Sequence, residues 1–131
     1  MLQIPRVPAQ PSAVMKSKPT ILCLEADTTG VYIRKMLLEE AGFEVLVSTD
    51  VPLAKKLLGS TRIHAVLVDV KAIRANRSVA AELKQLKPKV PIIALSPYEW
   101  LPSDLSKDVD AVHTQLAPPD ELLAKLRRVI D

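Results

Sequence analysis

Five short apolar runs alternate with longer amphipathic stretches over most of this sequence. Each run is bounded by polar residues, Gly or Pro, and is too short for a typical helix. Continuous apolar runs of this kind are typical of strands that are buried on both faces of a parallel sheet. The stretches between them carry apolar residues at helical spacing. The pattern predicts strands at residues 21–24, 43–47, 63–68, 92–95 and 110–114.

The stretches between the strands predict helices with recognisable ends. Asp27 or Thr28 is expected to cap the first helix, which Gly42 ends. Pro52 lies at the start of the second helix, and Gly59 is expected to end it. Residues 97–107 hold at most a short helix. A third helix is expected at about residues 76–87, and Pro118 lies at the start of the last helix. The apolar residues expected to face the sheet are Ile33, Met36, Leu37 and Ala41 in the first helix and Leu53, Leu57 and Leu58 in the second. In the third helix they are Val79, Leu83 and Leu86, and in the last helix Leu122, Leu123, Leu126, Val129 and Ile130.

Alternation of strands and helices with short connections requires a parallel sheet with right-handed crossovers. We therefore predict an α/β fold, a flavodoxin-like, doubly wound five-stranded parallel sheet in the order 2-1-3-4-5 with helices on both faces. The functional crevice of such a fold lies at the carboxyl ends of the first and third strands. Glu25 and Asp69 end these two strands. Asp69 is either a functional acid at this edge or a residue that caps the segment after it.

The first 18 residues differ from the rest of the chain. Pro5, Pro8 and Pro11 are evenly spaced, and few large apolar side chains lie between them, which favours an extended or disordered segment. We expect residues 1–18 to be a proline-containing tail and residues 19–131 to be one domain. The tail contains three of the 18 basic residues and no acidic residue, which leaves 15 basic and 15 acidic residues in the domain. A neutral domain predicts no nucleic-acid partner.

The sequence also limits the chemistry and the location of the protein. Cys23 is the only cysteine, so it has no partner for an internal disulfide, and its apolar neighbours predict a buried, inert thiol. No apolar stretch approaches the length of a membrane span, and the N-terminus lacks the apolar core of a secretory signal. We expect a cytoplasmic protein without a membrane partner.

Residues 19–131 resemble the receiver domain of bacterial two-component response regulators. The resemblance rests on four stretches, which together are more specific than any one of them. These are Ile21-Leu22-Cys23-Leu24-Glu25, residues 32–45 (YIRKMLLEEAGFEV), Ala65-Val66-Leu67-Val68-Asp69 and Pro91-Ile92-Ile93-Ala94-Leu95-Ser96.

This resemblance implies a role for each polar residue at the strand ends. Asp69 takes the position of the phosphoacceptor, which attacks a phosphoryl group carried by a histidine kinase or a phosphotransfer protein. Ser96 takes the position of the hydroxyl that bonds the phosphoryl oxygen, and Gln115 stands at the usual lysine position. Glu25 and Asp69 would hold Mg²⁺. Ala26 replaces the second acid of the family's acidic pair, which predicts weak or absent Mg²⁺ binding.

Further departures concern the surroundings of this site. Val112 stands at the position of the family's aromatic switch residue, and residues 70–74 replace the Met-Pro and Gly of the loop after the acceptor. Asp27 is close enough in sequence to replace the missing acid, but we expect it to cap the first helix.

The expected function is a stand-alone receiver domain in phosphorelay signal transduction that accepts a phosphoryl group on Asp69, signals through contacts with a downstream protein, or does both. The alternative is a pseudo-receiver that binds partners without phosphorylation. A small enzyme on the same fold is a third possibility, but it lacks a second catalytic group, so we do not expect an enzyme. His64 and His113 are expected to have structural or surface roles. Tyr98 and Trp100 either bind a partner or pack beneath the short helix.

Overall fold

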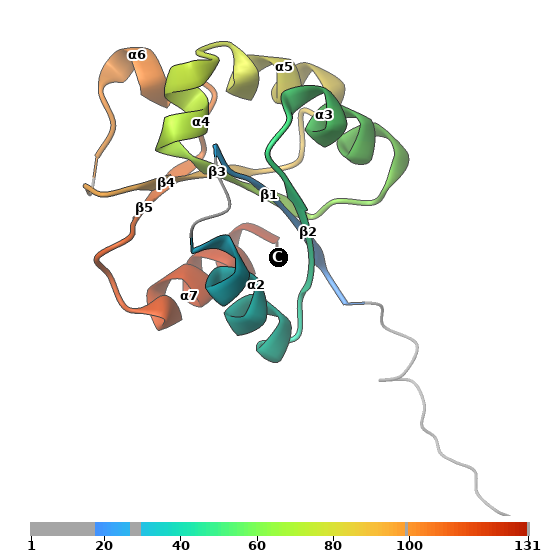
Figure 1. Cartoon of the computed structure of the whole chain (residues 1–131), viewed down its shortest axis with the longest axis vertical. Helices are drawn as coiled ribbons and strands as arrows, with labels where there is room; N and C mark the ends of the chain where they lie inside the picture. Colours follow the sequence, from blue (N-terminus) through green and yellow to red (C-terminus); the bar gives the residue numbers. More distant parts are fainter. Residues whose placement is uncertain (1–17, 27–29, 99, 131) are drawn as a thin grey trace, which may run out of the picture.

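The computed structural model describes residues 18–26, 30–98 and 100–130. A five-stranded parallel sheet lies at its centre, with the strand order β2-β1-β3-β4-β5 (Figure 1). This confirms the predicted α/β fold and the predicted strand order. The strands are β1 (Thr20–Leu24), β2 (Glu44–Ser48), β3 (Ala65–Asp69), β4 (Ile92–Ser96) and β5 (Ala111–Thr114).

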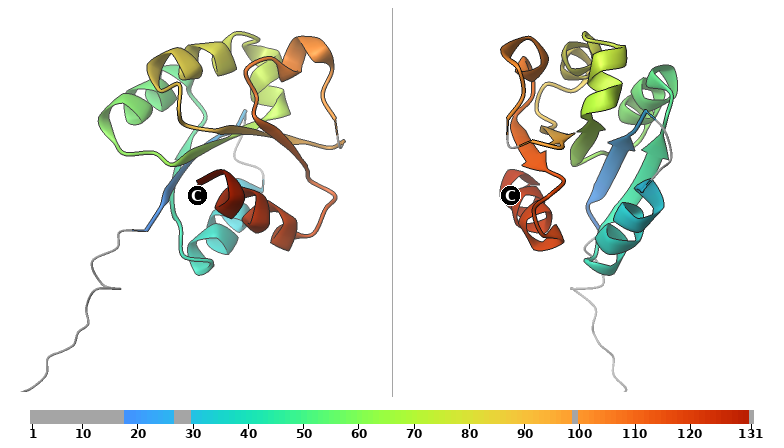
Figure 2. Two further views of the ribbon diagram at one scale, coloured as in Figure 1. Left: turned by 180° about the vertical axis from the view of Figure 1, so that it is seen from behind. Right: turned by 60° about the vertical axis from the view of Figure 1, so that its left-hand side comes forward.

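Helices cover both faces of this sheet. They are α2 (Val31–Glu40), α3 (Val51–Ser60), α4 (Val70–Ala75), α5 (Val79–Leu86), α6 (Ser103–Ser106) and α7 (Pro119–Ile130). Helices α2 and α7 lie on one face, and α3, α4, α5 and α6 lie on the other (Figure 1, Figure 2). Within the described part of the chain, no helix combines the length and the apolar character needed to cross a bilayer.

The core has two halves because successive side chains of a strand point to opposite faces of the sheet. In β3, Val66 and Val68 join the apolar cluster that includes residues of α3, α4 and α5, whereas Ala65 and Leu67 join the cluster that includes residues of α2 and α7. Every residue of β1, β3 and β4 is buried. This explains why these strands have no polar alternation in the sequence.

The buried face of α2 differs from the prediction. Val31 and Leu38 are the buried residues of this helix. Ile33, Met36 and Leu37 were expected inside but are 65%, 55% and 40% exposed. The helix carries large apolar side chains on more than one face, so their spacing alone does not select the face that packs on the sheet.

Helices α3 and α5 show a smaller error of the same kind. In α3, Leu58 is buried as predicted, but Leu53 is 42% exposed and its neighbour Ala54 is buried instead. In α5, Leu83 is buried and Leu86 is 44% exposed. The inward face of α7 was predicted correctly: Leu122 and Leu126 are buried, and Leu123, Val129 and Ile130 pack against the same cluster.

The glycines mark the helix ends only in part. Gly42 follows α2 with a φ of +100°, as predicted for a residue just beyond a helix. Gly59 was predicted to end the second helix but lies within α3. Helix α2 begins directly after Gly30, whose φ is +79°, so the predicted cap at Asp27 or Thr28 is wrong; those two residues lie outside the described ones.

The segment after Asp69 is helical, which the sequence did not indicate. Instead of a loop followed by one helix at about 76–87, the chain forms α4 directly after β3 and then α5. Val70, Ala72 and Ile73 of α4 are buried against the sheet. Helix α4 has only six residues, which are too few to show a helical spacing of apolar positions distinct from the strand before it.

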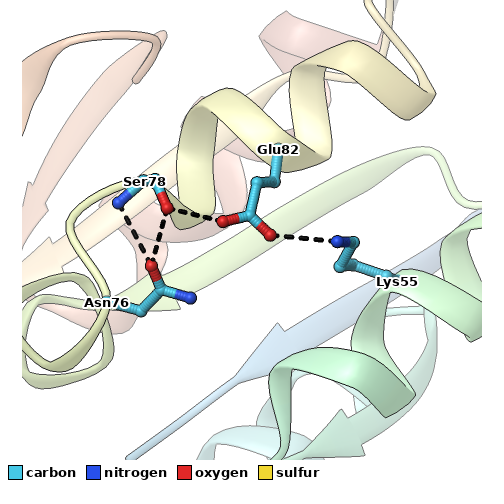
Figure 3. A network of polar contacts seen from close by, with 4 residues as sticks. All are labelled: Lys55, Asn76, Ser78 and Glu82. Carbon is cyan, nitrogen blue, oxygen red and sulfur yellow. Dashed lines mark hydrogen bonds and ion pairs between the residues drawn. The ribbon is translucent and has the colours of Figure 1, made fainter.

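A polar network holds α5 against α3 (Figure 3). Lys55 of α3 forms an ion pair with Glu82 of α5 at 3.0 Å. The Ser78 side chain contacts Glu82 at 2.5 Å and Asn76 at 2.9 Å. The hydroxyl of Ser78 and then the ammonium of Lys55 hold the pKa of Glu82 below its usual value. These contacts fix the junction between α4 and α5.

Candidate functional site at the carboxyl edge of the sheet

Four polar residues lie at the carboxyl ends of neighbouring strands. Glu25 follows β1, Asp69 ends β3, Ser96 ends β4 and Gln115 follows β5. These strands are consecutive in the sheet. The backbone pairing continues beyond β5, because the Gln115 N–H donates to the Ser96 carbonyl at 2.8 Å. The structure therefore places all four residues predicted from the sequence along one edge.

Glu25 is a buried carboxylate that is paired with a cation. Its residue is only 2% exposed, and its side chain forms an ion pair with the guanidinium of Arg34 from α2. The Arg34 side chain is 18% exposed. A carboxylate at this depth requires a compensating charge or several hydrogen bonds. Arg34 supplies that charge from within the chain.

Asp69 is the cap of the helix that follows it. Its residue is 8% exposed, and its Oδ1 atom accepts a hydrogen bond from the Lys71 N–H at 3.3 Å. This contact satisfies one of the first N–H groups of α4, which have no partner within the helix. The capping interpretation of Asp69 is therefore correct, and a role as phosphoacceptor stays a prediction.

Ser96 and Gln115 differ in exposure. Ser96 is 1% exposed, and its Oγ atom accepts a hydrogen bond from the Tyr98 N–H at 3.0 Å. Gln115 is exposed. It lines a cleft of about 180 Å³ together with Arg34 and His113. The amide of Gln115 can donate a hydrogen bond to an anion there, but it adds no charge.

Among the described residues, the donor set of this edge does not fit a divalent cation. Mg²⁺ requires oxygen ligands in near-octahedral geometry, and the described residues contain no cluster of three or more Asp, Glu, His or Cys side chains. Ala26 is exposed and adds no carboxylate, and Asp27 lies outside the described residues. Of the two predicted ligands, Glu25 is already neutralised by Arg34.

Arg34 is the residue at this edge that the sequence analysis missed. It lies nine positions after Glu25, on a helix that carries several other charges. Basic residues on an amphipathic helix usually face solvent, so its spacing gave no signal. Only the packing of α2 on the sheet brings its guanidinium to Glu25.

The other titratable residues predicted to be structural are indeed built into the fold. The Nδ1 atom of His64 accepts the Thr20 N–H at 3.0 Å, which ties the start of β3 to β1. His113 is buried in β5. Cys23 is fully buried, and burial, followed by the charge of Glu25, raises the pKa of its thiol to about 12. This thiol is inert, as predicted.

An exposed aromatic pair lies beside the edge. Tyr98 and Trp100 are 57% and 61% exposed, and their rings stack with centroids 5.8 Å apart. With Leu116 and Glu121 they line a groove of about 460 Å³. The exposure of both rings argues against packing beneath α6, and partner binding by these aromatics stays a prediction.

Comparisons with known proteins agree on the fold. No protein-family model matches the sequence, and a search of curated proteins found no match. Among solved structures, a CheY-like response regulator receiver domain protein from Methanospirillum hungatei JF-1 is similar with a TM-score of 0.75 and 21% identity, over 88% of this chain and 95% of that one. A response regulator from Thermotoga maritima is similar with a TM-score of 0.73 and 20% identity, over 86% and 98% of the two chains.

A third similar structure was solved with ligands. It is the response regulator TrrA from Thermotoga maritima in complex with Mg²⁺ and BeF, with a TM-score of 0.73 and 25% identity over 85% of this chain and 98% of that one. The neighbours thus match the strand order, the layers and most of the length of this chain. The chain therefore has the fold of the response regulator receiver domains of phosphorelay signalling.

Proposed function

We propose that this chain is a receiver-fold module of phosphorelay signalling that acts by contacting other proteins and does not require a phosphoryl group on Asp69. One observation carries this proposal: three polar side chains of the edge, those of Glu25, Asp69 and Ser96, already have partners within the chain. Glu25 pairs with Arg34. Asp69 and Ser96 each accept a backbone N–H from the residue two positions further along. Each of these three side chains therefore has a partner that is neither a metal ion nor a phosphoryl group.

The exposed aromatic pair supports a protein partner. Aromatic residues are concentrated in the hot spots of protein interfaces. Tyr98, Trp100 and Leu116 together present a large apolar surface next to the acidic Glu121. A downstream protein would bind at this surface. The upstream partner in the signalling pathway would be a histidine kinase or a phosphotransfer protein. The cytoplasmic location stays a prediction from the sequence.

The second candidate function is phosphoryl acceptance by Asp69. Its support is the position of Asp69 at the end of β3, between the ends of β1 and β4. A carboxylate oxygen of Asp69 would attack phosphorus, the P–N bond of a phosphohistidine would break, and the departing imidazole would take up a proton. Ser96 would then donate its hydroxyl to a phosphoryl oxygen in place of its present role as acceptor. Gln115 would donate a hydrogen bond to a phosphoryl oxygen, but unlike a lysine it would add no positive charge.

A phosphorylation assay separates the two candidates. The full-length chain would be incubated with acetyl phosphate and Mg²⁺, and its intact mass measured beside that of Asp69→Asn, which keeps an oxygen for the cap of α4. We expect neither protein to gain the mass of a phosphoryl group. A gain in the wild type that Asp69→Asn lacks would overturn the proposal and make Asp69 the acceptor.

Partner capture provides the second measurement. Asp69→Asn should retain as much of the bound protein as the wild type, because the proposed contact does not depend on phosphorylation. Trp100→Ser should retain less, because it removes half of the exposed aromatic stack. Loss of the partner in Asp69→Asn with retention in Trp100→Ser would contradict the proposal.

A further inference from the structure

We infer that the guanidinium of Arg34 supplies the positive charge at the carboxyl edge of the sheet and thereby keeps divalent cations from binding at Glu25 and Asp69. This goes beyond the proposed function, because it concerns metal binding and holds whether or not Asp69 accepts a phosphoryl group. It also identifies the residue that would have to change for the edge to become a metal site.

The strand geometry places the two carboxylates on the same side of the sheet. Cys23 of β1 and Leu67 of β3 pair with each other and belong to the cluster that includes residues of α2 and α7. Because side chains alternate along a strand, the residues two positions further along, Glu25 and Asp69, point to this same side. The ion pair of Glu25 with Arg34 of α2 agrees with this placement.

The surroundings of the ion pair strengthen it. The cleft beside Arg34 is lined by Ile33, Leu37, Leu95 and Leu122, among other residues. Apolar walls lower the local dielectric constant and so increase the attraction between opposite charges. A guanidinium carries a permanent positive charge. Because this guanidinium is attached to the chain, its pairing with Glu25 does not cost the translational entropy that an ion loses when it binds from solution.

A divalent cation would have to displace this guanidinium. The displaced Arg34 would lose its carboxylate partner within a mostly buried position, which is unfavourable. If Arg34 stayed in place, an incoming cation would be repelled by it and would find Glu25 already neutralised. Without Arg34, this positive charge would be absent from an edge that carries the carboxylates of Glu25 and Asp69, and carboxylates attract a hard cation such as Mg²⁺.

Metal titration of the full-length chain tests this inference. Mg²⁺ binding would be measured by calorimetry, and Mn²⁺ binding by the broadening of amide resonances near Glu25 and Asp69. We expect no saturable binding by the wild type at millimolar metal. Arg34→Met should bind both ions at least about tenfold more tightly, because one positive charge next to the carboxylates is removed.

Lys35→Met is the matched control for this experiment. It makes the same change of charge one residue away, but Lys35 pairs with Glu39 on the exposed side of α2. It should therefore behave like the wild type. Saturable Mg²⁺ binding by the wild type, or equal binding by the Arg34→Met and Lys35→Met variants, would overturn the inference.

A third variant covers the case in which Arg34→Met folds poorly because the buried Glu25 loses its guanidinium partner. Glu25→Gln combined with Arg34→Met removes both charges and should fold without binding metal. The melting temperature of Arg34→Met should rise with Mg²⁺ because the ion would bind the folded state, whereas that of the double variant should not. A melting temperature of Arg34→Met that does not respond to Mg²⁺ would contradict the inference. None of these measurements uses a phosphodonor, so their outcome is distinct from that of the phosphorylation assay.

Discussion

At the scale of single residues, His113 is held in an unusual electrostatic environment. Its residue is 4% exposed, and the ammonium of Lys125 on α7 lies 3.5 Å from its Nδ1 atom. Burial and then the charge of Lys125 lower the pKa of His113; Glu121 opposes this and Arg34 adds to it. The imidazole is therefore neutral in the folded protein at neutral pH.

This environment predicts a dependence of stability on pH. Because the folded-state pKa lies below the ordinary value of 6.5, the unfolded chain takes up the proton first as the pH falls. The stability that comes from a neutral His113 is fully present above the unfolded-state pKa and is lost as the pH falls through the folded-state pKa. Melting temperatures measured from about pH 7.5 to about pH 5 should therefore decrease.

The contribution of His113 to this decrease can be isolated by substitution. His113→Gln cannot titrate, so its melting temperature should fall less over the same pH range. If the wild type and His113→Gln lose stability in parallel, the pH dependence comes from other groups and the assignment to His113 is wrong.

At the scale of elements, the helix ends show how backbone conformation decides the effect of a residue. Gly42 has a φ of +100°, in the region that side-chain-bearing residues avoid, whereas Gly59 has an ordinary conformation within α3. Neither position has an atom within 4 Å of the place where a Cβ atom would lie. Space is therefore not the limiting factor at either glycine, and the two differ only in backbone geometry.

Alanine substitution at these two glycines should have opposite effects. Gly59→Ala should stabilise the protein by roughly 0.5–1 kcal/mol, because glycine in a helix costs backbone entropy. Gly42→Ala should destabilise it by about 1–2 kcal/mol, because alanine is strained at positive φ. Urea unfolding measures both. A change in the same direction at both positions would show that backbone conformation is not the cause.

At the scale of the whole molecule, the two-sided core of the described residues lies after residue 18. The buried apolar residues of both clusters lie between Ile21 and Leu126. The first 18 residues contain prolines and few large apolar side chains, and such terminal segments usually contribute little to stability. The stability of the sheet and its helices should therefore not depend on them.

Deletion of residues 1–18 tests this expectation. The melting temperature of the shortened chain should stay within about two degrees of that of the full chain, because the core residues of the described part all lie outside the deleted segment. Circular dichroism of the two proteins at equal concentration would measure it. A loss of several degrees would mean that the segment packs on the domain, and the division into a tail and a domain would then be wrong.

The parallel sheet could be predicted from the amino-acid sequence. Strands buried on both faces leave continuous apolar runs, and right-handed crossovers leave few ways to order them. These two facts predict the parallel sheet and place Glu25 and Asp69 at one edge of it. The strand order follows once the sheet is taken as flavodoxin-like, and Ser96 and Gln115 were identified only through the resemblance to receiver domains. The burial of Cys23 follows in the same way from its position inside an apolar run.

The contacts between side chains of different elements became known from the folded chain and not from the sequence. The exposed apolar face of α2, the continuation of the chain into α4 directly after Asp69, and the pairing of Arg34 with Glu25 could not be predicted. Spacing along a helix shows which residues share a face, but the inward face and its contacts depend on how the helix is rotated and placed on the sheet. An ion pair between two elements depends on that placement. For this reason the pairing of the Arg34 guanidinium with Glu25 could be recognised only in the folded chain.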